Sequence, residues 1–319
     1  MKTMIDGKGK DGSGVSAESA SQWCPEGFGH YREWYPATPP LSLSGITDVT
    51  EDFCQQWNQG IGKVTEDLRR SAASTTLLFV RGFMGNFMPG NFEAPRKAFA
   101  NLGFDSRIVP NSSRDSVHNN VQRLKHHLLQ FPPRTNLVFC AHSRGGIECL
   151  QLLSESPIWD SRCRGLLLSQ TARGPSLVLD SVLLGMHRHE SLSHYRRSAE
   201  FMQKIGLKIL GADRGGLELT SGGITELIGK IGFEKRSYPI VQTASWSTKP
   251  TAWLDSFHGR MSEIAPGIAH DGQFLLKDLL WPGWPHLLLP HLDHAQPVMG
   301  GNGFDSVRYW LTYVNGILK

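Results

Sequence analysis

The chain has 319 residues, enough to bury one large core or two small ones, and its composition of 39% hydrophobic and 19% charged residues is that of an ordinary globular protein. The formal net charge of +4 is mild, and no dense patch of lysine and arginine is interleaved with aromatics, so we do not expect nucleic acid as a partner. No apolar run reaches the roughly 18 residues that a transmembrane helix needs.

The N-terminal part differs in composition from the rest. Residues 1 to about 20 are rich in glycine, serine and lysine without periodicity, which predicts a disordered tail, and residues 21–45 carry aromatics among prolines, which predicts irregular packing. The first residues lack the apolar core of a secretory signal, and the five cysteines show no CxxC spacing. We therefore expect an extension over residues 1–45, a single domain over 46–319, and a cytoplasmic location.

From residue 46 onward the pattern alternates between helical spacing and short apolar runs. Strands alternating with helices predict an α/β fold with a mostly parallel central sheet and helices on both faces. We expect helices over 46–70, 93–102, 113–129, from 147, and over 306–317, and strands over 75–80, 104–109, 136–141, 164–169, 238–244 and 286–289.

Residues 174–235 interrupt this alternation and are interpreted as a helical cap inserted between two strands. Val178, Val182 and Met186 stand four apart, with Leu179 and Leu183 beside them, which places an apolar stripe on one face of a helix. Two roles stay open: the stripe packs on the body as core, or part of it roofs a cleft.

The most informative stretch joins the strand over 136–141 to the helix from 147. Ser143 lies between them, with Ala141 two residues before it and Gly145 two residues after it. This is the small-x-Ser-x-Gly pattern of a nucleophile elbow, with alanine at the first small position. The turn is tight and exposes the serine hydroxyl at the carboxyl edge of the sheet.

A serine hydroxyl becomes a good nucleophile when a base removes its proton and a third group orients that base. In this architecture an acid follows the serine along the chain, and a histidine follows the acid. His291 and His294 both come directly after the last expected strand, whereas Asp271 and Asp255 both follow the strand over 238–244.

An oxyanion hole needs two backbone N–H groups beside the nucleophile. The residue after the serine, Arg144, supplies one. The loop Gly82-Phe83-Met84-Gly85 follows the first strand of the sheet and is flanked by glycines, so we assign the second donor to Phe83.

From about Thr75 to Ile317 the chain resembles bacterial α/β-hydrolases of the lipase/esterase group. The resemblance implies Ser143 as the nucleophile, Asp271 as the acid and His294 as the base. Two departures from the usual family pattern are Arg81 for histidine and Ala141 for glycine. The motifs that carry the resemblance are Leu78-Phe79-Val80-Arg81-Gly82-Phe83-Met84-Gly85, Ala141-His142-Ser143-Arg144-Gly145-Gly146, His270-Asp271-Gly272 and Leu292-Asp293-His294-Ala295.

The resulting hypothesis is a serine hydrolase that cleaves carboxylic esters, of small molecules or lipids, through an acyl-enzyme intermediate and without a cofactor. Two alternatives are an acyltransferase with the same triad and a catalytically silent ligand-binding protein of the same fold. A metal site is not expected, because the spacing of the histidines at 258, 270, 286, 291 and 294 matches no ligand pattern. Asp293 is not expected to be the acid, because it adjoins the expected base His294 in sequence and the side chains of sequence neighbours seldom face each other.

Overall fold

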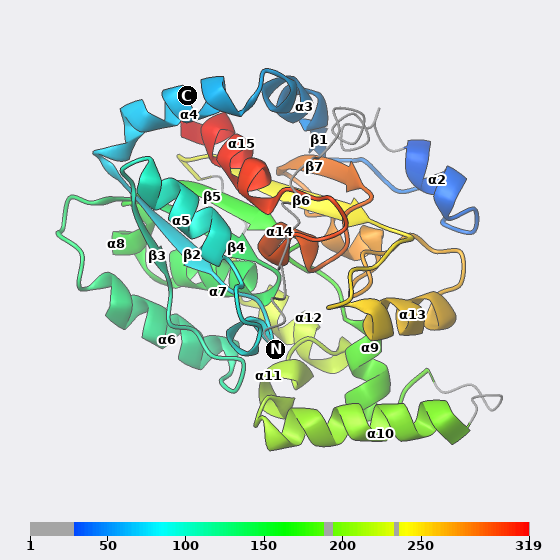
Figure 1. The fold of residues 1–319 in the computed structure, drawn as a ribbon. Coiled ribbons are helices and arrows are strands. Elements are labelled where there is room, and N and C mark those ends of the chain that lie inside the picture. The colour runs from blue at the N-terminus through cyan, green and yellow to red at the C-terminus, as the bar shows by residue number, and fades with distance from the viewer. Residues whose placement is uncertain (1–28, 188–193, 233–235, 319) are drawn as a thin grey trace, which may run out of the picture.

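The computed structural model describes residues 29–187, 194–232 and 236–318. In this part of the chain seven strands form one sheet in the order β1-β7-β6-β5-β4-β2-β3, and every neighbouring pair is parallel (Figure 1). The α/β class with a central parallel sheet is confirmed. The strands are β1 (Thr47–Asp48), β2 (Thr75–Val80), β3 (Asp105–Ile108), β4 (Asn136–His142), β5 (Cys163–Ser169), β6 (Ile240–Trp246) and β7 (Pro285–Pro290).

The central strands are buried on both faces, which explains their continuous apolar runs. All six residues of β2 are buried, and they alternate between two cores: Leu78 and Val80 pack on one face of the sheet, while Leu77 and Phe79 pack on the other. This period of two is the geometry of a pleated strand. The apolar run therefore places β2 inside the molecule with both faces covered.

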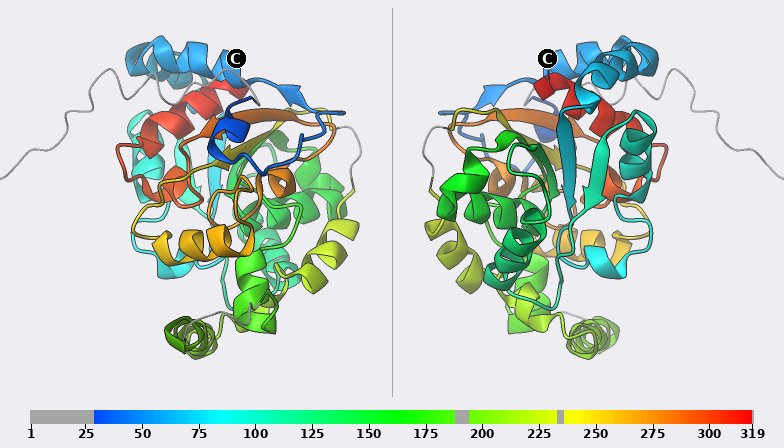
Figure 2. Two further views of the ribbon diagram at one scale, coloured as in Figure 1. Left: turned by 90° about the vertical axis from the view of Figure 1, so that its right-hand side faces the viewer. Right: turned by 90° about the vertical axis from the view of Figure 1, so that its left-hand side faces the viewer.

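Two groups of helices cover these faces (Figures 1 and 2). One core lies beneath α3 (Thr50–Asn58), α4 (Ile61–Ala72), α5 (Glu93–Asn101) and α15 (Ser306–Leu318), and the other lies beneath α6 (Val117–Leu128) and α7 (Arg144–Glu155). The helices of the body are α2 (His30–Trp34), α3 (Thr50–Asn58), α4 (Ile61–Ala72), the 3-10 turn η2 (Gly85–Phe87), α5 (Glu93–Asn101), α6 (Val117–Leu128), α7 (Arg144–Glu155), α8 (Pro157–Asp160), α13 (Asp255–Ile264), the 3-10 turn η4 (Leu276–Leu279), α14 (Gln296–Met299) and α15 (Ser306–Leu318).

The region before β2 differs from the single helix expected over 46–70. It contains the edge strand β1 and two helices, which are separated at Gly60, a residue with a φ of 88° that a helix interior does not allow. The helix expected over 113–129 begins only at Val117, because the Ser116 side chain accepts a hydrogen bond from the Asn119 N–H and caps it.

The described part of the N-terminal extension, residues 29–45, contains the short helix α2 followed by irregular chain, and it packs against the rest of the domain. The Tyr35 hydroxyl donates a hydrogen bond to the Ser247 carbonyl, and the Thr38 hydroxyl oxygen accepts one from the Ala269 N–H. The first contact lies directly after β6, and the second lies two residues before Asp271. The predicted tail over residues 1–20 lies outside the described residues.

Between β5 and β6 the described residues form a helical segment, which we call the insertion (residues 174–235). It contains α9 (Leu177–Leu179), the π-helical turn η3 (Asp180–Leu184), α10 (His194–Ile209), α11 (Asp213–Leu217) and α12 (Ser221–Gly229). Figure 2 shows it at one end of the molecule, with α10 outermost. Val178 and Val182 are buried in the core, whereas Met186 is 42% exposed, so the expected stripe does not act as one face. None of the described helices is long and apolar enough to cross a membrane.

Candidate active site

Ser143 occupies the turn between β4 and α7 in a strained conformation. Its φ of 55° and ψ of −129° lie outside the regions that residues with a side chain normally adopt, a cost of about 1–3 kcal/mol that the surroundings must offset. The Ser143 N–H donates to the Ser169 carbonyl at 2.9 Å, which ties the turn to the neighbouring strand β5. The conformation matches the elbow that the sequence predicts.

Two glycines let the chain approach this turn closely. A Cβ added at Gly82 would lie 2.7 Å from the Ser143 Cβ, and one at Gly145 would lie 2.5 Å from the Val80 carbonyl oxygen. Both distances are shorter than real carbon contacts. Only glycine therefore lets the loop after β2 pass directly beside the serine.

Asp271 and His294 meet at the carboxyl edge of the same sheet, although 22 residues separate them. Asp271 follows β6 and His294 follows β7, and the Nδ1 of His294 lies 2.7 Å from the Oδ2 of Asp271. The other carboxylate oxygen accepts the N–H groups of Gln273 and Phe274 at 2.9 and 2.8 Å. Asp271 is fully buried and His294 is 7% exposed.

The charge state of Asp271 follows from these contacts. Burial raises the pKa of the carboxyl, but the neighbouring His294 and the two backbone N–H groups outweigh burial, so the pKa lies below its ordinary value. An ionised Asp271 fixes the proton of His294 on Nδ1 and leaves Nε2 as the basic nitrogen. This is the tautomer that a general base needs.

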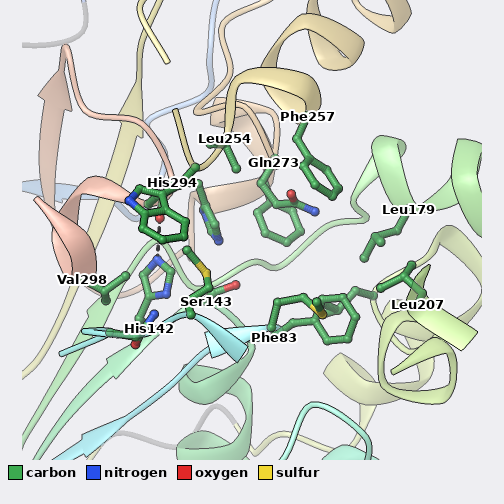
Figure 3. Close-up of a pocket in the computed structure, with 17 residues that line it drawn as sticks. Phe83, His142, Ser143, Leu179, Leu207, Leu254, Phe257, Gln273, His294 and Val298 are labelled. Carbon is green, nitrogen blue, oxygen red and sulfur yellow. Dashed lines mark hydrogen bonds between the residues drawn. The ribbon is translucent and has the colours of Figure 1, made fainter. Parts of the chain in front are cut away.

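A second buried histidine supports the first. The Nε2 of His142 lies 2.7 Å from the His294 carbonyl oxygen, a contact drawn in Figure 3, and 3.3 Å from the Gln170 Oε1. Burial, and then the neighbouring His294, lower the pKa of His142 to about 3. His142 is therefore a neutral donor that holds the backbone of His294 in place.

The two expected oxyanion donors flank Ser143. Arg144 is the first residue of α7, and Phe83 follows Gly82 in the loop that contacts the serine. Neither N–H donates to any other described residue. Both groups are thus available to an oxygen atom bound beside Ser143.

The remaining candidates lie elsewhere. Asp255 is exposed at the start of α13, and His291 packs against Trp34 with 3.8 Å between ring centroids. Asp293 accepts the N–H groups of Ala295 and Gln296 directly before the short helix α14. Across the described ranges no three His, Cys, Asp or Glu side chains are grouped so that they could hold a metal ion.

Ser143 and His294 line one cavity of about 230 Å³ with mostly apolar walls (Figure 3). Most of these wall residues could not be predicted from the sequence, because an apolar pattern does not reveal which neighbour an apolar side chain meets. The cavity is lined by Phe83, Met84, Met88, Asn91, His142, Ser143, Leu179, Leu207, Leu219, Trp253, Leu254, Phe257, Gln273, Phe274, His294, Ala295 and Val298.

Comparison with solved structures identifies the fold. A metagenomic carboxyl esterase, MGS0156, superposes on this structure with a TM-score of 0.58 at 15% sequence identity. The match covers 77% of this chain and 76% of the esterase chain. The mature form of the Bacillus licheniformis lipase BlEst2 gives a TM-score of 0.50 at 16% sequence identity. This match covers 75% of this chain and 92% of the lipase chain. The chain has the α/β-hydrolase fold, which confirms the resemblance seen in the sequence at the level of the fold.

No protein-family model matches the sequence. No curated protein matches it either.

Proposed function

We propose that this protein is a serine hydrolase that cleaves carboxylic esters through an acyl-enzyme intermediate. The observation that carries the proposal is the buried pair of Asp271 and His294, 2.7 Å apart, in which His294 lines the same cavity as Ser143. Such a trio, in a fold shared with an esterase and a lipase, supports acyl transfer to a serine.

In the proposed reaction, Ser143 Oγ attacks the ester carbonyl while His294 Nε2 takes its proton. Asp271 stabilises the imidazolium that forms, and the N–H groups of Phe83 and Arg144 bind the oxyanion. His294 then returns the proton to the leaving alcohol, and water cleaves the acyl-enzyme by the same steps in reverse order.

The cavity supports an apolar ester as the substrate. Leu179, Leu207 and Leu219 of the insertion face Ser143 across it, so we propose that the insertion acts as the cap expected from the sequence. Its volume of about 230 Å³ is below the roughly 300–1,000 Å³ of pockets for drug-sized ligands, which favours a small or medium-sized ester. A cytoplasmic location remains a prediction.

The direct test is covalent labelling by a fluorophosphonate probe. Wild-type protein should lose ester hydrolysis in step with the incorporation of one probe at Ser143, and Ser143→Ala should not be labelled. A protein that binds esters without labelling or turnover would instead be a silent receptor. Adding an alcohol acceptor during turnover distinguishes the acyltransferase, which would form a new ester in place of free acid.

A further inference from the structure

A buried ion pair lies directly behind the elbow and has no part in the reaction described so far. Arg144 and Glu148 are one turn apart on α7, with 3.2 Å between Arg144 Nε and Glu148 Oε1. Their side chains are 0% and 1% exposed. Two charges are costly to bury unless additional hydrogen bonds hold them, so their other contacts show what the pair stabilises.

The guanidinium group of Arg144 joins the elbow to two loops. Its Nη2 donates to the Ser112 carbonyl at 2.7 Å and its Nη1 to the Asp115 carbonyl at 3.1 Å. Its Cζ lies 5.6 Å from the centroid of the Phe83 ring. The side chain of one expected oxyanion donor therefore contacts the side chain of the other.

Glu148 reaches the same loop by a second route. Its Oε2 accepts a hydrogen bond from Asn111 Nδ2 at 2.8 Å, and the same Nδ2 donates to the Arg81 carbonyl at 2.6 Å. Arg81 stands two residues before Phe83. The other oxygen of Glu148 accepts from Asn120 Nδ2 at 2.7 Å. One carboxylate is thus connected to both halves of the oxyanion hole.

We infer that Glu148 is a positioning residue that sets the distance between the Phe83 and Arg144 N–H groups. The inference rests on the proposed function, because the hole has work to do only when an oxyanion forms. At that step a bond forms between Ser143 Oγ and the carbonyl carbon, the π electrons of the C=O bond move to oxygen, and the serine proton passes to His294. A misplacement of about 1 Å between donors and oxyanion is expected to cost about 100-fold in rate.

The test is Glu148→Gln, which keeps the size of the side chain, removes its charge and turns an N–H₂ group toward one of the two asparagine amides. We expect kcat/KM for a short ester to fall about 100-fold while KM changes less than about threefold, because the oxyanion exists only in the transition state. Glu155→Gln is the control, since Glu155 lies on the same helix and its side chain is 33% exposed beside Lys125.

A pair of ketones separates positioning from general damage. A trifluoromethyl ketone forms a tetrahedral oxyanion adduct with the serine, whereas the methyl ketone of the same chain length binds mainly as the planar ground state. In Glu148→Gln the inhibition constant of the trifluoromethyl ketone should rise by the same factor as the loss in kcat/KM, and that of the methyl ketone should stay within about twofold.

Asn111→Ala removes the hydrogen bonds to the Arg81 carbonyl and to Glu148 Oε2 but keeps the contacts of Glu148 with Arg144 and Asn120, and it is the second variant in case Glu148→Gln does not fold. It should lose about tenfold in kcat/KM with the same split between the two ketones. Equal weakening of both ketones, or of neither, would overturn the inference. If wild-type protein fails to bind the trifluoromethyl ketone through Ser143, the proposed function fails as well, and Ser143→Ala measured beside it distinguishes the two results.

Discussion

The two walls of the cavity are built in different ways. On the wall from the sheet edge, His142 and His294 are polar and are fixed by hydrogen bonds: the fully buried Asp271 accepts three, one of them from His294, and His142 holds the backbone of His294. On the wall from the insertion and α13, Leu179, Leu207, Leu219 and Phe257 meet the cavity with apolar side chains alone. Hydrogen bonds are directional and the hydrophobic effect is not.

This difference teaches where precision is needed. In the proposed function the sheet wall holds the reacting atoms, and buried, paired groups at strand ends can fix them within a fraction of an ångström. The insertion wall has only to exclude water and accept an apolar group, so its exact packing matters less. Changes to the first wall should affect kcat, and changes to the second should affect the choice of substrate.

The largest expected effect is at Ser143. Ser143→Ala should lower ester turnover by about 10⁵- to 10⁶-fold, because the nucleophile is lost and only binding and the oxyanion hole remain. Turnover above a tenth of the wild-type rate would refute the assignment. Ser143→Gly should abolish turnover as well, yet raise the melting temperature above that of Ser143→Ala, since glycine adopts a φ of 55° without strain.

Asp271→Asn should have the next largest effect. The amide can still accept the backbone N–H groups, so the fold should persist, but it cannot stabilise the imidazolium or enforce its tautomer, and kcat should fall about 10³- to 10⁴-fold. The control is Asp255→Asn at the exposed start of α13, which should stay within about twofold of wild type. Greater damage from the Asp255 variant would show that Asp255 is the acid.

The sheet wall could be largely predicted from the sequence. Strands buried on both faces leave continuous apolar runs, so β2 was predicted at its observed bounds, Thr75–Val80. The tight elbow requires small residues, which made Ser143 recognisable. Chain order then limited the acid to two carboxylates, and the structure brings Asp271 rather than Asp255 against His294.

The rest depends on contacts between distant parts of the chain, which no local pattern records. The edge strand β1 has two exposed residues and exists only because it pairs with Pro285 and His286 of β7. The stripe expected around Val182 looked suited to a cap, but Val182 is buried in the core and Leu179 of the same segment lines the cavity. Which residue of this stripe lines the cavity is decided by how the insertion packs on the body.

Three buried histidines should also make stability sensitive to acid. Burial is the main cause that lowers the pKa of His142 and His270 to about 3 and of His286 to about 4. Unfolded histidines titrate near 6.5, so below that pH the unfolded chain binds more protons than the folded one. The stabilisation is complete above about pH 6.5, and the free energy of unfolding should fall toward pH 4, by up to about 1.4 kcal/mol per pH unit for each histidine.

Urea unfolding between pH 7.5 and 4.5 measures this slope. His286→Asn should reduce the slope between pH 6.5 and 4.5 by about a third of the contribution of the three histidines, whatever it costs in stability at pH 7.5. Equal slopes in wild type and His286→Asn would show that His286 binds its proton equally in both states.

The smallest expected effect is on the insertion wall, at Leu207 of α10. Leu207 lines the cavity and is 7% exposed, so Leu207→Ala removes apolar contact from a bound ester without changing a reacting group. Each substrate methylene left without contact costs about 0.8 kcal/mol, which is about a fourfold loss in kcat/KM. An octanoyl ester should therefore lose activity relative to an acetyl ester.

Two controls separate substrate contact from packing. Ile209→Ala changes the same helix at a side chain that is 78% exposed, and it should alter the hydrolysis of neither ester. Val182→Ala weakens the core at a residue that does not line the cavity. It should lower the melting temperature with little change in the octanoyl-to-acetyl activity ratio. If Leu207→Ala behaves like Val182→Ala, the insertion contributes stability alone, and the acyl group lies against the sheet wall. If the octanoyl-to-acetyl activity ratio changes in Leu207→Ala but not in the two controls, the insertion contacts the acyl group and selects the ester.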